Sequence, residues 1–410
     1  MTFKKSLMLA GGSLFILLLS ACGSSSTNTD ASTTDLPITL TDAASDRTFA
    51  FTAAGDQVVF VFDVSAQSDI LEANGITDIS TIERVEVRGS FNSWSSSEDF
   101  YLTASSTDEG IWFLSVDADE INIPGNSGQP EYKFVVTVGE TSSWFNVSEN
   151  TPVGYQFSGN HILVFSGDNI ETIIANDAQA KNEKSLSDFD LTTIEGQQEI
   201  SNFRQVPELS NLFRSYHPFK QSRDMEAEAT RIEYVNSFMV TNNIGSVITL
   251  SGEEAAVAPE FITDYMQAIM DAGDNLLLDI SYKLVYFSSD GDEFSAAVKS
   301  TVEFINDDSH PAPFLIHCRL GTDRTGVLTA VLAGLSGVSW DKIAADYQLS
   351  NRLGISEFRD QGLLRYSLRH MLNVDPADEG VDLQQALVNY FINNATLTQS
   401  QIDKMVAKIN

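Results

Sequence analysis

Residues 317–326 read His317-Cys318-Arg319-Leu320-Gly321-Thr322-Asp323-Arg324-Thr325-Gly326, and the runs on either side of this stretch are apolar. The run before it, Phe314 to Ile316, has the length of a short buried strand, and the run after it, Val327 to Leu335, has the length of a helix. Upstream, residues 231–242 and 261–272 have helical apolar spacing and residues 246–250 and 276–287 read as strands, and this alternation of strands and helices predicts an α/β layer architecture. A short loop between a strand and a helix binds anions, because its backbone N–H groups point inward and the helix N-terminus adds partial positive charge.

The spacing of Cys318 and Arg324 suits a single phosphate group. Five residues separate them, so the sulfur can lie below the phosphorus while the guanidinium lies along two non-bridging oxygens. Arginine fits this place because its planar fork donates two parallel hydrogen bonds and keeps its charge at any pH. The field of the loop favours the thiolate, which is the attacking form of cysteine. Gly321 permits the backbone to curl, and Thr325 can donate to the sulfur when it leaves.

The stretch resembles the signature loop of cysteine-dependent phosphatases, HC-x5-R-[ST]-G. With residues 346–351 it looks most like the bacterial tyrosine-phosphatase and atypical dual-specificity branch, and residues 202–204 and 213–215 resemble the opening motifs of that branch. The resemblance covers roughly residues 196–370 and implies a two-step phosphocysteine mechanism. Cys318 is then the nucleophile and Arg324 the phosphate clamp. The implied phosphate-binding loop consists of His317, Arg319, Leu320, Gly321, Thr322, Asp323, Thr325 and Gly326.

The leaving oxygen needs a proton, so a general acid must come from another loop. Residues 276–287 are predicted to form a strand, and residues 288–293 the loop after it. These families carry their acid in a loop of this kind, which favours Asp290, then Asp292, and third Asp323 within the signature loop. A solvated loop carboxylate is the alternative for each. Arg352 and Arg359 are expected on C-terminal helices, either near the pocket or as exposed helix charges.

The region from 37 to 170 has short apolar runs rich in Val, Ile, Phe and Tyr, such as 58–64, 85–91 and 132–138, and predicts an all-β sandwich. Residues 85–94, 110–113 and 131–136 resemble glycogen-binding modules, which are immunoglobulin-like sandwiches. The resemblance implies a sugar-binding role for Trp94, Lys133 and Trp144. The alternative is that the motif marks the fold alone, without a ligand.

The first residues read as a bacterial export signal, with Lys4 and Lys5 before an apolar stretch at 7–19. Residues 19–22, Leu-Ser-Ala-Cys, resemble the lipobox, which implies a signal peptide at 1–21 and a lipid on Cys22. The Ser/Thr/Asn-rich residues 22–36 are predicted to be a flexible tether. By resemblance to known lipoproteins, Gly23 and Ser24 favour the outer membrane of the bacterial cell envelope.

Composition and charge set the remaining expectations. A linker at 171–195 separates the sandwich from a phosphatase domain at 196–410, in which helices flank a central sheet. Against 24 basic residues stand 57 acidic ones, a net charge of −33, which argues against nucleic acid and anionic lipid as general partners. No metal-ligand spacing is present, so no metal and no cofactor are expected.

Three functions remain open from the sequence. The first is a phosphomonoesterase tethered at the envelope that acts on phosphotyrosine or mixed phosphoprotein substrates. The second is a phosphatase of a phosphorylated sugar, glucan or inositol, recruited by the sandwich. The third is a lipoprotein that binds an anion without turnover, and the intact Cys318 and Arg324 argue against it.

Overall fold

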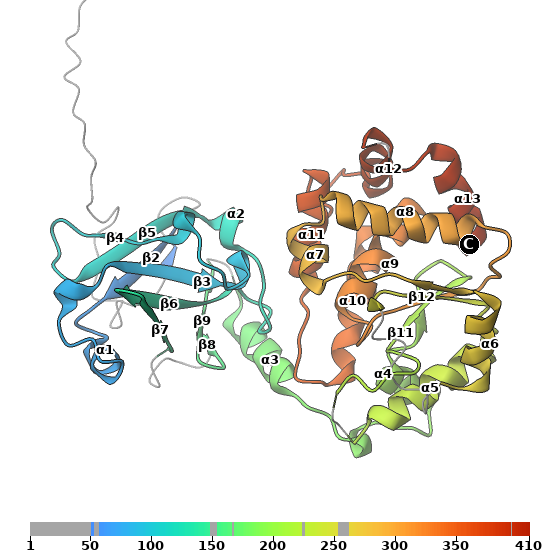
Figure 1. Ribbon diagram of the computed structural model, residues 1–410, viewed down its shortest axis with the longest axis horizontal. Helices are drawn as coiled ribbons and strands as arrows, with labels where there is room; N and C mark the ends of the chain where they lie inside the picture. The colour runs from blue at the N-terminus through green and yellow to red at the C-terminus, as the bar shows by residue number, and fades with distance from the viewer. Residues whose placement is uncertain are drawn as a thin grey trace, which may run out of the picture.

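The computed structural model describes residues 51–52, 57–147, 154–165, 168–223, 226–252, 262–394 and 396–410. The predicted signal peptide, Cys22 and the tether lie outside these ranges. Helix α3 (Ile170–Lys181) connects a strand-rich N-terminal half to a C-terminal half of strands and helices (Figure 1). Within the described ranges, no helix has the length and hydropathy needed to cross a membrane.

The N-terminal half contains two sheets that pack against each other. The first has the order β1-β2-β5-β4, and in the second β6 pairs with β3, β7 and β9, while β8 pairs with β9. Aromatic rings fill the space between the sheets, with ring centroids 5.0 Å apart for Phe60 and Tyr132 and 5.3 Å apart for Phe62 and Phe134. The strands are β1 (Phe51–Thr52), β2 (Gln57–Asp63), β3 (Arg84–Gly89), β4 (Thr103–Ala104), β5 (Ile111–Asp117), β6 (Glu131–Val138), β7 (Thr141–Phe145), β8 (Gln156–Phe157) and β9 (Asn160–Ile162). Two short helices, α1 (Ser68–Ala73) and α2 (Ala118–Ile121), complete it.

These strands confirm the sheet-rich N-terminal half. The apolar runs at 58–64, 85–91 and 132–138 coincide with β2, β3 and β6 to within two residues at each end. The immunoglobulin-like assignment stays a prediction.

The C-terminal half is built on a five-stranded sheet in the order β10-β11-β14-β12-β13. Its strands are β10 (Arg204–Gln205), β11 (Leu212–Ser215), β12 (Ser246–Thr249), β13 (Asn275–Leu277) and β14 (Phe314–His317). Strand β14 lies at the centre, parallel to both β11 and β12. Its alternate residues enter two different cores, Phe314 and Ile316 on one face and Leu315 on the other. This burial on both faces explains the uninterrupted apolar run in the sequence.

Helices cover both faces of this sheet. Helices α5 and α6 contribute to the core that contains Leu315, and α8 and α9 contribute to the core on the opposite face. The helices of this half are α4 (Ile194–Ser201), α5 (Glu228–Thr241), α6 (Asp264–Ala272), α7 (Tyr282–Phe287), α8 (Asp292–Asn306), α9 (Asp323–Leu335), α10 (Trp340–Leu349), α11 (Gln361–Leu372), α12 (Leu383–Asn393) and α13 (Gln399–Ile409).

One sequence expectation differs from the structure. The prediction of one strand over 276–287 is wrong, because β13 ends at Leu277 and helix α7 begins at Tyr282. Ser281 caps α7, its side chain accepting a hydrogen bond from the N–H of Lys283, and this capping turns an apolar run of strand-like composition into a helix. The predicted linker at 171–195 is largely helical, since it contains most of α3 and the start of α4.

Candidate active site

Cys318 directly follows the central strand β14, where the carboxyl ends of the parallel strands meet. In open α/β sheets this edge is the usual place for a ligand. The cysteine is 2% exposed. Helix α9 begins at Asp323, four residues earlier than the apolar run indicates, so Arg324 lies in its first turn. The sequence from 317 to 326 therefore forms the expected strand, loop and helix.

The loop is held in place by residues from the predicted opening motifs. Gly321 has a φ of +73°, and a β-carbon there would lie 2.1 Å from the carbonyl oxygen of Ser215, so only glycine fits. Arg214 Nη2 donates to the carbonyl of Gly321 at 2.7 Å, and Asn202 Nδ2 donates to that of Leu320 at 3.1 Å. These contacts fix the loop carbonyls and leave the opposite side of the loop to a ligand.

Asp346 holds the two motif arginines together. Its carboxylate accepts hydrogen bonds from Arg204 Nε and Arg214 Nη1, both at 2.6 Å. Burial alone would raise the pKa of Asp346, but the two guanidinium groups outweigh it and keep the pKa below its usual value. The charged triad therefore stays intact at neutral pH and braces the loop.

His317 is fully buried behind the loop. Its Nε2 lies 2.9 Å from Thr249 Oγ1, and its Nδ1 lies 3.2 Å from the carbonyl oxygen of Cys318. Burial lowers the pKa of His317 to about 4, so the ring is neutral at physiological pH. These contacts order the loop, and His317 is not among the residues that line the Cys318 pocket.

Acid should destabilise the protein through this ring. Because the pKa of His317 is about 4 in the folded state against 6.5 ordinarily, the unfolded chain binds one more proton between these pH values. The contribution of the neutral ring to the free energy of unfolding is fully present above pH 6.5. It decreases by roughly 3 kcal/mol as the pH is lowered to 4. Burial also lowers the pKa of His217, which adds to the same trend.

Urea unfolding of His317→Asn across this pH range measures the effect. In the variant, the slope of the free energy of unfolding against pH should decrease by the amount due to about one bound proton, whatever the variant's absolute stability. An unchanged slope in His317→Asn would contradict the assignment.

Arg324 and Thr325 lie in the first turn of α9, directly after the loop. Arg324 Nη1 donates to the carbonyls of Leu250 at 3.2 Å and Ile280 at 3.0 Å, which orients the guanidinium at the edge of the pocket. The hydroxyl of Thr325 is buried and has no hydrogen-bond partner among the described residues. It remains available to a thiolate at Cys318.

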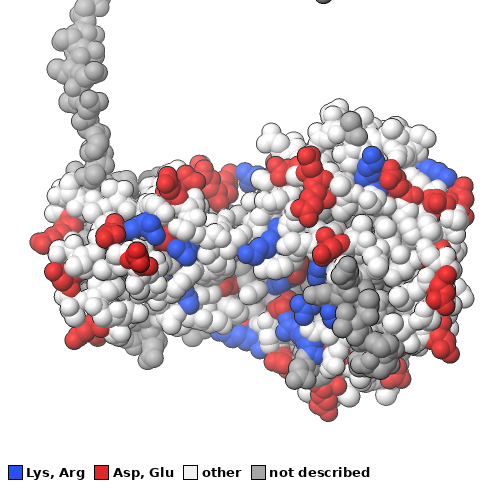
Figure 2. Space-filling model, in the orientation of Figure 1, with Lys and Arg blue, Asp and Glu red and all other residues white. Residues whose placement is uncertain are grey.

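A pocket of about 580 Å³ opens over the cysteine. It is lined by Asn126, Arg223, Tyr282, Cys318, Arg319, Leu320, Thr322, Asp323, Arg324, Ser356, Glu357 and Arg359. Four of these residues are arginines, which suits an anion despite the acidic chain. Figure 2 shows basic side chains gathered on the face where the two halves meet.

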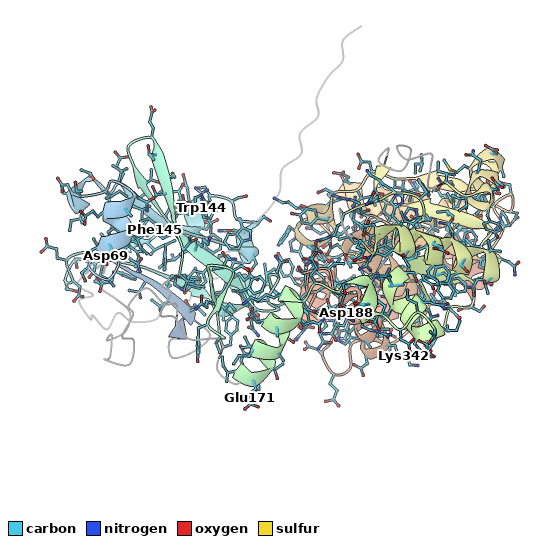
Figure 3. The ribbon with its side chains drawn as sticks, turned by 90° about the horizontal axis from the view of Figure 1, so that it is seen from below. Asp69, Trp144, Phe145, Glu171, Asp188 and Lys342 are labelled. Atoms are coloured by element: carbon cyan, nitrogen blue, oxygen red, sulfur yellow. The ribbon has the colours of Figure 1, made fainter. Side chains whose placement is uncertain are left out.

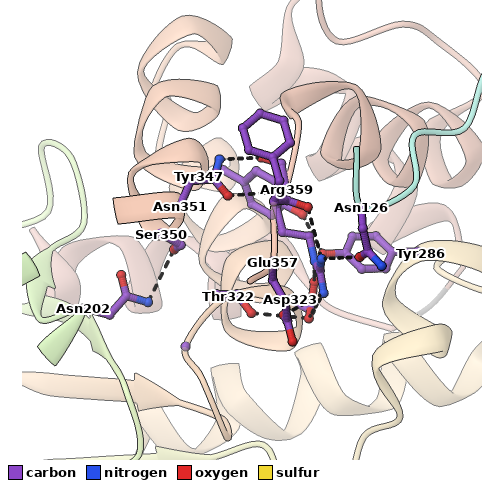
Figure 4. A network of polar contacts seen from close by, with 12 residues as sticks. Asn126, Asn202, Tyr286, Thr322, Asp323, Tyr347, Ser350, Asn351, Glu357 and Arg359 are labelled. Atoms are coloured by element: carbon purple, nitrogen blue, oxygen red, sulfur yellow. Dashed lines mark hydrogen bonds and ion pairs between the residues drawn. The ribbon is translucent and has the colours of Figure 1, made fainter. Parts of the chain in front are cut away.

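A charged network closes one side of this pocket (Figure 4). Arg359 pairs through Nε and Nη2 with Asp323 and through Nη2 with Glu357 at 3.0 Å, while Tyr286 donates to Asp323 at 2.7 Å. Burial would raise the pKa of Asp323, but Arg359 outweighs it and lowers the pKa. Arg359 Nη1 also donates to Asn126 Oδ1 at 3.1 Å. The N-terminal half therefore contributes a side chain to the Cys318 pocket.

Of the three predicted candidates for the general acid, only Asp323 lines the Cys318 pocket. Asp290 and Asp292 are absent from the residues that line the Cys318 pocket. The side chain of Asp290 is 51% exposed, 3.2 Å from His370 Nε2, and Asp292 begins α8. Asp323 lines the pocket but is paired with Arg359. The assignment of Asp290 stays a prediction that this placement does not favour.

Sequence reasoning missed Glu357. This carboxyl lines the pocket with Cys318, and burial raises its pKa despite the nearby arginines Arg223 and Arg359. No local motif marks it, because it reaches the pocket from the segment before α11. Arg359, whose role the sequence left open, lines the pocket, whereas Arg352 pairs with Glu199 and is not part of the lining.

The fold and the site define a cysteine-dependent phosphatase: a buried thiol after a central parallel strand, a tight glycine loop, and an arginine in the first turn of the next helix. A model of the tyrosine phosphatase family matches residues 181–409. The chain belongs to this family.

Among solved structures, two of the catalytic core of Siw14 are similar. One shares 15% sequence identity with a TM-score of 0.26. The other, the core catalytic domain of the PP-IP phosphatase SIW14 from S. cerevisiae in complex with citrate, shares 17% with a TM-score of 0.23. Each comparison covers 48% of this chain and 94% of the other. No curated protein matches the sequence significantly. Among the described residues, no group of three or more His, Cys, Asp or Glu side chains could hold a metal ion.

Proposed function

We propose that this chain hydrolyses phosphate monoesters through a phosphocysteine formed on Cys318. The observation that carries the proposal is the placement of Cys318 and Arg324 in one basic pocket at the carboxyl end of the central strand. The loop amides and the Arg324 guanidinium stabilise the charge on the equatorial oxygens as phosphorus passes from one ligand to the next.

The reaction has two steps. In the first, the thiolate of Cys318 attacks phosphorus, the P–O ester bond breaks, and the leaving oxygen takes the electron pair and a proton. In the second, water attacks the phosphocysteine and gives a proton to the carboxylate left by the first step, the P–S bond breaks with its electron pair on sulfur, and inorganic phosphate leaves. The hydroxyl of Thr325, which has no partner within the described part of the chain, then donates to the thiolate.

For the proton donor we favour Glu357. A general acid must be protonated before the transition state. Burial raises the pKa of Glu357 although Arg223 and Arg359 pair with its carboxylate, whereas the pairing with Arg359 lowers the pKa of Asp323. Asp323 is instead suited to hold Arg359 in place. Asp290 remains the alternative from the sequence.

The test of this function is phosphate release from an aryl phosphate by the wild-type chain, together with trapping of radiolabelled phosphate on Cys318 after acid quench. We expect a labelled, acid-stable protein adduct that accumulates within one turnover. Turnover without a protein adduct would contradict the phosphocysteine, and absence of turnover would favour an anion-binding protein.

Three substrate classes remain in competition. Phosphotyrosine and mixed phosphoprotein substrates follow from the family, which favours a protein-tyrosine or dual-specificity phosphatase. Inositol phosphate and phosphorylated carbohydrate are the alternatives, and carbohydrate depends on the sandwich acting as a glycogen-binding-like module. The contact of Asn126 with Arg359 favours a substrate that touches both halves.

We also propose that a lipid on Cys22 tethers the chain to the bacterial cell envelope, with the outer membrane favoured. Radiolabelled palmitate should enter the wild-type chain and not Cys22→Ala, and the variant should move to the soluble fraction, because the buried acyl chains supply the anchor. Cell fractionation with autoradiography measures both. A protein that is exported without label would overturn the tether.

A further inference from the structure

The segment that carries Glu357 and Arg359 is anchored in the other half of the chain. Both residues line the Cys318 pocket. Phe358, which stands between them, is not part of that lining and is 7% exposed. Its ring belongs to a small apolar core whose other buried members come from the sandwich and from α3: Phe157, Ile162 and Ala180. The side chain between the proposed acid and its arginine therefore packs against the sandwich.

Main-chain hydrogen bonds hold the chain just before this segment. The N–H of Lys184 donates to the carbonyl of Gly354 at 2.7 Å, and the N–H of Ser356 donates to the carbonyl of Asn182 at 3.0 Å. Both contacts come from residues that directly follow α3, which Figure 3 shows between the two halves, marked by Glu171. The helix that joins the halves therefore leads into contacts with the residues before the proposed acid.

A turn between α2 and β6 of the sandwich reaches the same segment. Gly128 in this turn has a φ of +83°, and a β-carbon there would lie 2.7 Å from the ring of Phe358. Asn126 Oδ1 accepts a hydrogen bond from Arg359 Nη1 at 3.1 Å, and Figure 4 shows these two side chains joined beside the pocket. The turn therefore contacts two successive residues of the segment.

A buried carboxylate fixes this turn. Glu131, at the start of β6, is 2% exposed. Its Oε1 accepts a hydrogen bond from the N–H of Ser127 at 2.7 Å, and its Oε2 accepts one from Asn160 Nδ2 at 2.7 Å. A buried polar network with satisfied hydrogen bonds is rigid. The sandwich therefore presents Asn126 and Gly128 at fixed positions.

The sugar-binding residues predicted from the sequence lie next to this turn. Trp94, Lys133 and Trp144 line a separate pocket of about 500 Å³, which shares Asn126 with the Cys318 pocket. Their role stays a prediction. The contacts with the 357–359 segment come from the turn itself, so a positioning role of the turn requires no sugar.

We propose that the sandwich positions the general acid: its turn at 126–128 and the apolar core around Phe358 hold Glu357 at the leaving oxygen of the substrate. This rests on the proposed phosphatase function. Misplacement of a catalytic group by about 1 Å can lower the rate about 100-fold. The phosphate-binding loop is held within the C-terminal half, by Arg214 and Asn202. Loss of the sandwich contacts should therefore impair protonation of the leaving group and leave phosphate binding intact.

The first test is Gly128→Ala in the full chain. The added β-carbon displaces the ring of Phe358, so kcat for an alkyl phosphate should fall about 10- to 100-fold. Turnover of nitrophenyl phosphate should change much less, because nitrophenolate leaves without a proton. Calorimetric titration with vanadate should give the wild-type Kd.

The matched control is Gly139→Ala. Gly139 also has a left-handed φ, +57°, while no heavy atom of the described residues lies within 4 Å of a β-carbon there. The control therefore has similar backbone strain without the contact with Phe358. It should keep the wild-type ratio of turnover on the two esters.

A second variant, Asn126→Ala, removes an exposed side chain. It should lower turnover of the alkyl phosphate about 10-fold, as expected for one lost hydrogen bond to a charged group, again with little effect on nitrophenyl phosphate. The double variant Gly128→Ala/Glu357→Gln should be no slower on the alkyl phosphate than Glu357→Gln alone. Both changes remove the same proton transfer, so their effects should not add.

The outcomes separate this proposal from the phosphatase function. A wild-type ratio of alkyl to nitrophenyl turnover in Gly128→Ala or in Asn126→Ala overturns the positioning role and leaves the phosphatase standing. An additive loss in the double variant does the same. Failure of the wild-type chain to hydrolyse either ester overturns the phosphatase itself.

Discussion

Replacement of Cys318 by serine should lower turnover by roughly 10⁴–10⁶-fold, the range found when a nucleophile is removed, while binding of phosphate or vanadate is retained. The hydroxyl ionises far less than the thiol, so attack on phosphorus fails. The loop is held by Gly321, Arg214 and Asn202. The guanidinium of Arg324 is held by the carbonyls of Leu250 and Ile280, so loop and arginine both remain in place without the sulfur. Steady-state kinetics and calorimetric titration with vanadate measure the two properties.

A matched comparison is Arg324→Lys in the chain that keeps Cys318. Lysine keeps the charge and loses the two parallel hydrogen bonds, so this variant should lose anion binding as well as turnover. Strong residual turnover in Cys318→Ser, or loss of anion binding there, would contradict the assigned roles.

The second large effect concerns the general acid. Glu357→Gln should lower turnover of an alkyl phosphate by roughly 10²–10⁴-fold and that of a nitrophenyl phosphate much less, because nitrophenolate leaves without a proton. Turnover by the wild type should fall as the pH rises through the pKa of the acid, which burial raises. The glutamine variant should have no such basic limb. Kinetics on both substrates across the pH range measure this.

Two further variants identify the acid. Asp290→Asn should stay near wild type on both substrates, because Asp290 is outside the pocket lining and half exposed. Asp323→Asn should lower both activities alike, since it releases Arg359 and Tyr286. If Asp290→Asn shows the dependence on leaving group instead, the acid is Asp290 and the cysteine mechanism survives.

The core of the site could be predicted from the sequence because it is local. Strand, loop and helix follow one another within 314–335, and backbone geometry dictates what such a loop binds. Residues 202–204, 213–215 and 346–351 are marked in the sequence only by their resemblance to motifs of the phosphatase branch. Their task, to brace the loop through Asp346, appears only once the sheet brings them together.

The rest of the site depends on long-range packing. Asn126 and Glu357 are 231 positions apart in the chain, and both contact Arg359. No local sequence pattern predicts contacts of such long range. The sequence predicts a strand over 276–287, and the resemblance to the phosphatases implies an acid in the loop after it. The cap at Ser281 starts a helix there instead, which carries Asp290 to the far end of α7.

The hydrogen bond from Arg359 to Asn126 bears on whether the two halves of the chain can be exchanged separately during evolution. The guanidinium that pairs with Asp323 inside the phosphatase pocket takes one of its acceptors from the sandwich. A recombination event that moved residues 196–410 to a new partner would carry the nucleophile and its loop but leave one wall of the pocket behind. The two halves are therefore expected to be inherited as one unit, and substitutions at 126 and 359 are expected to occur together.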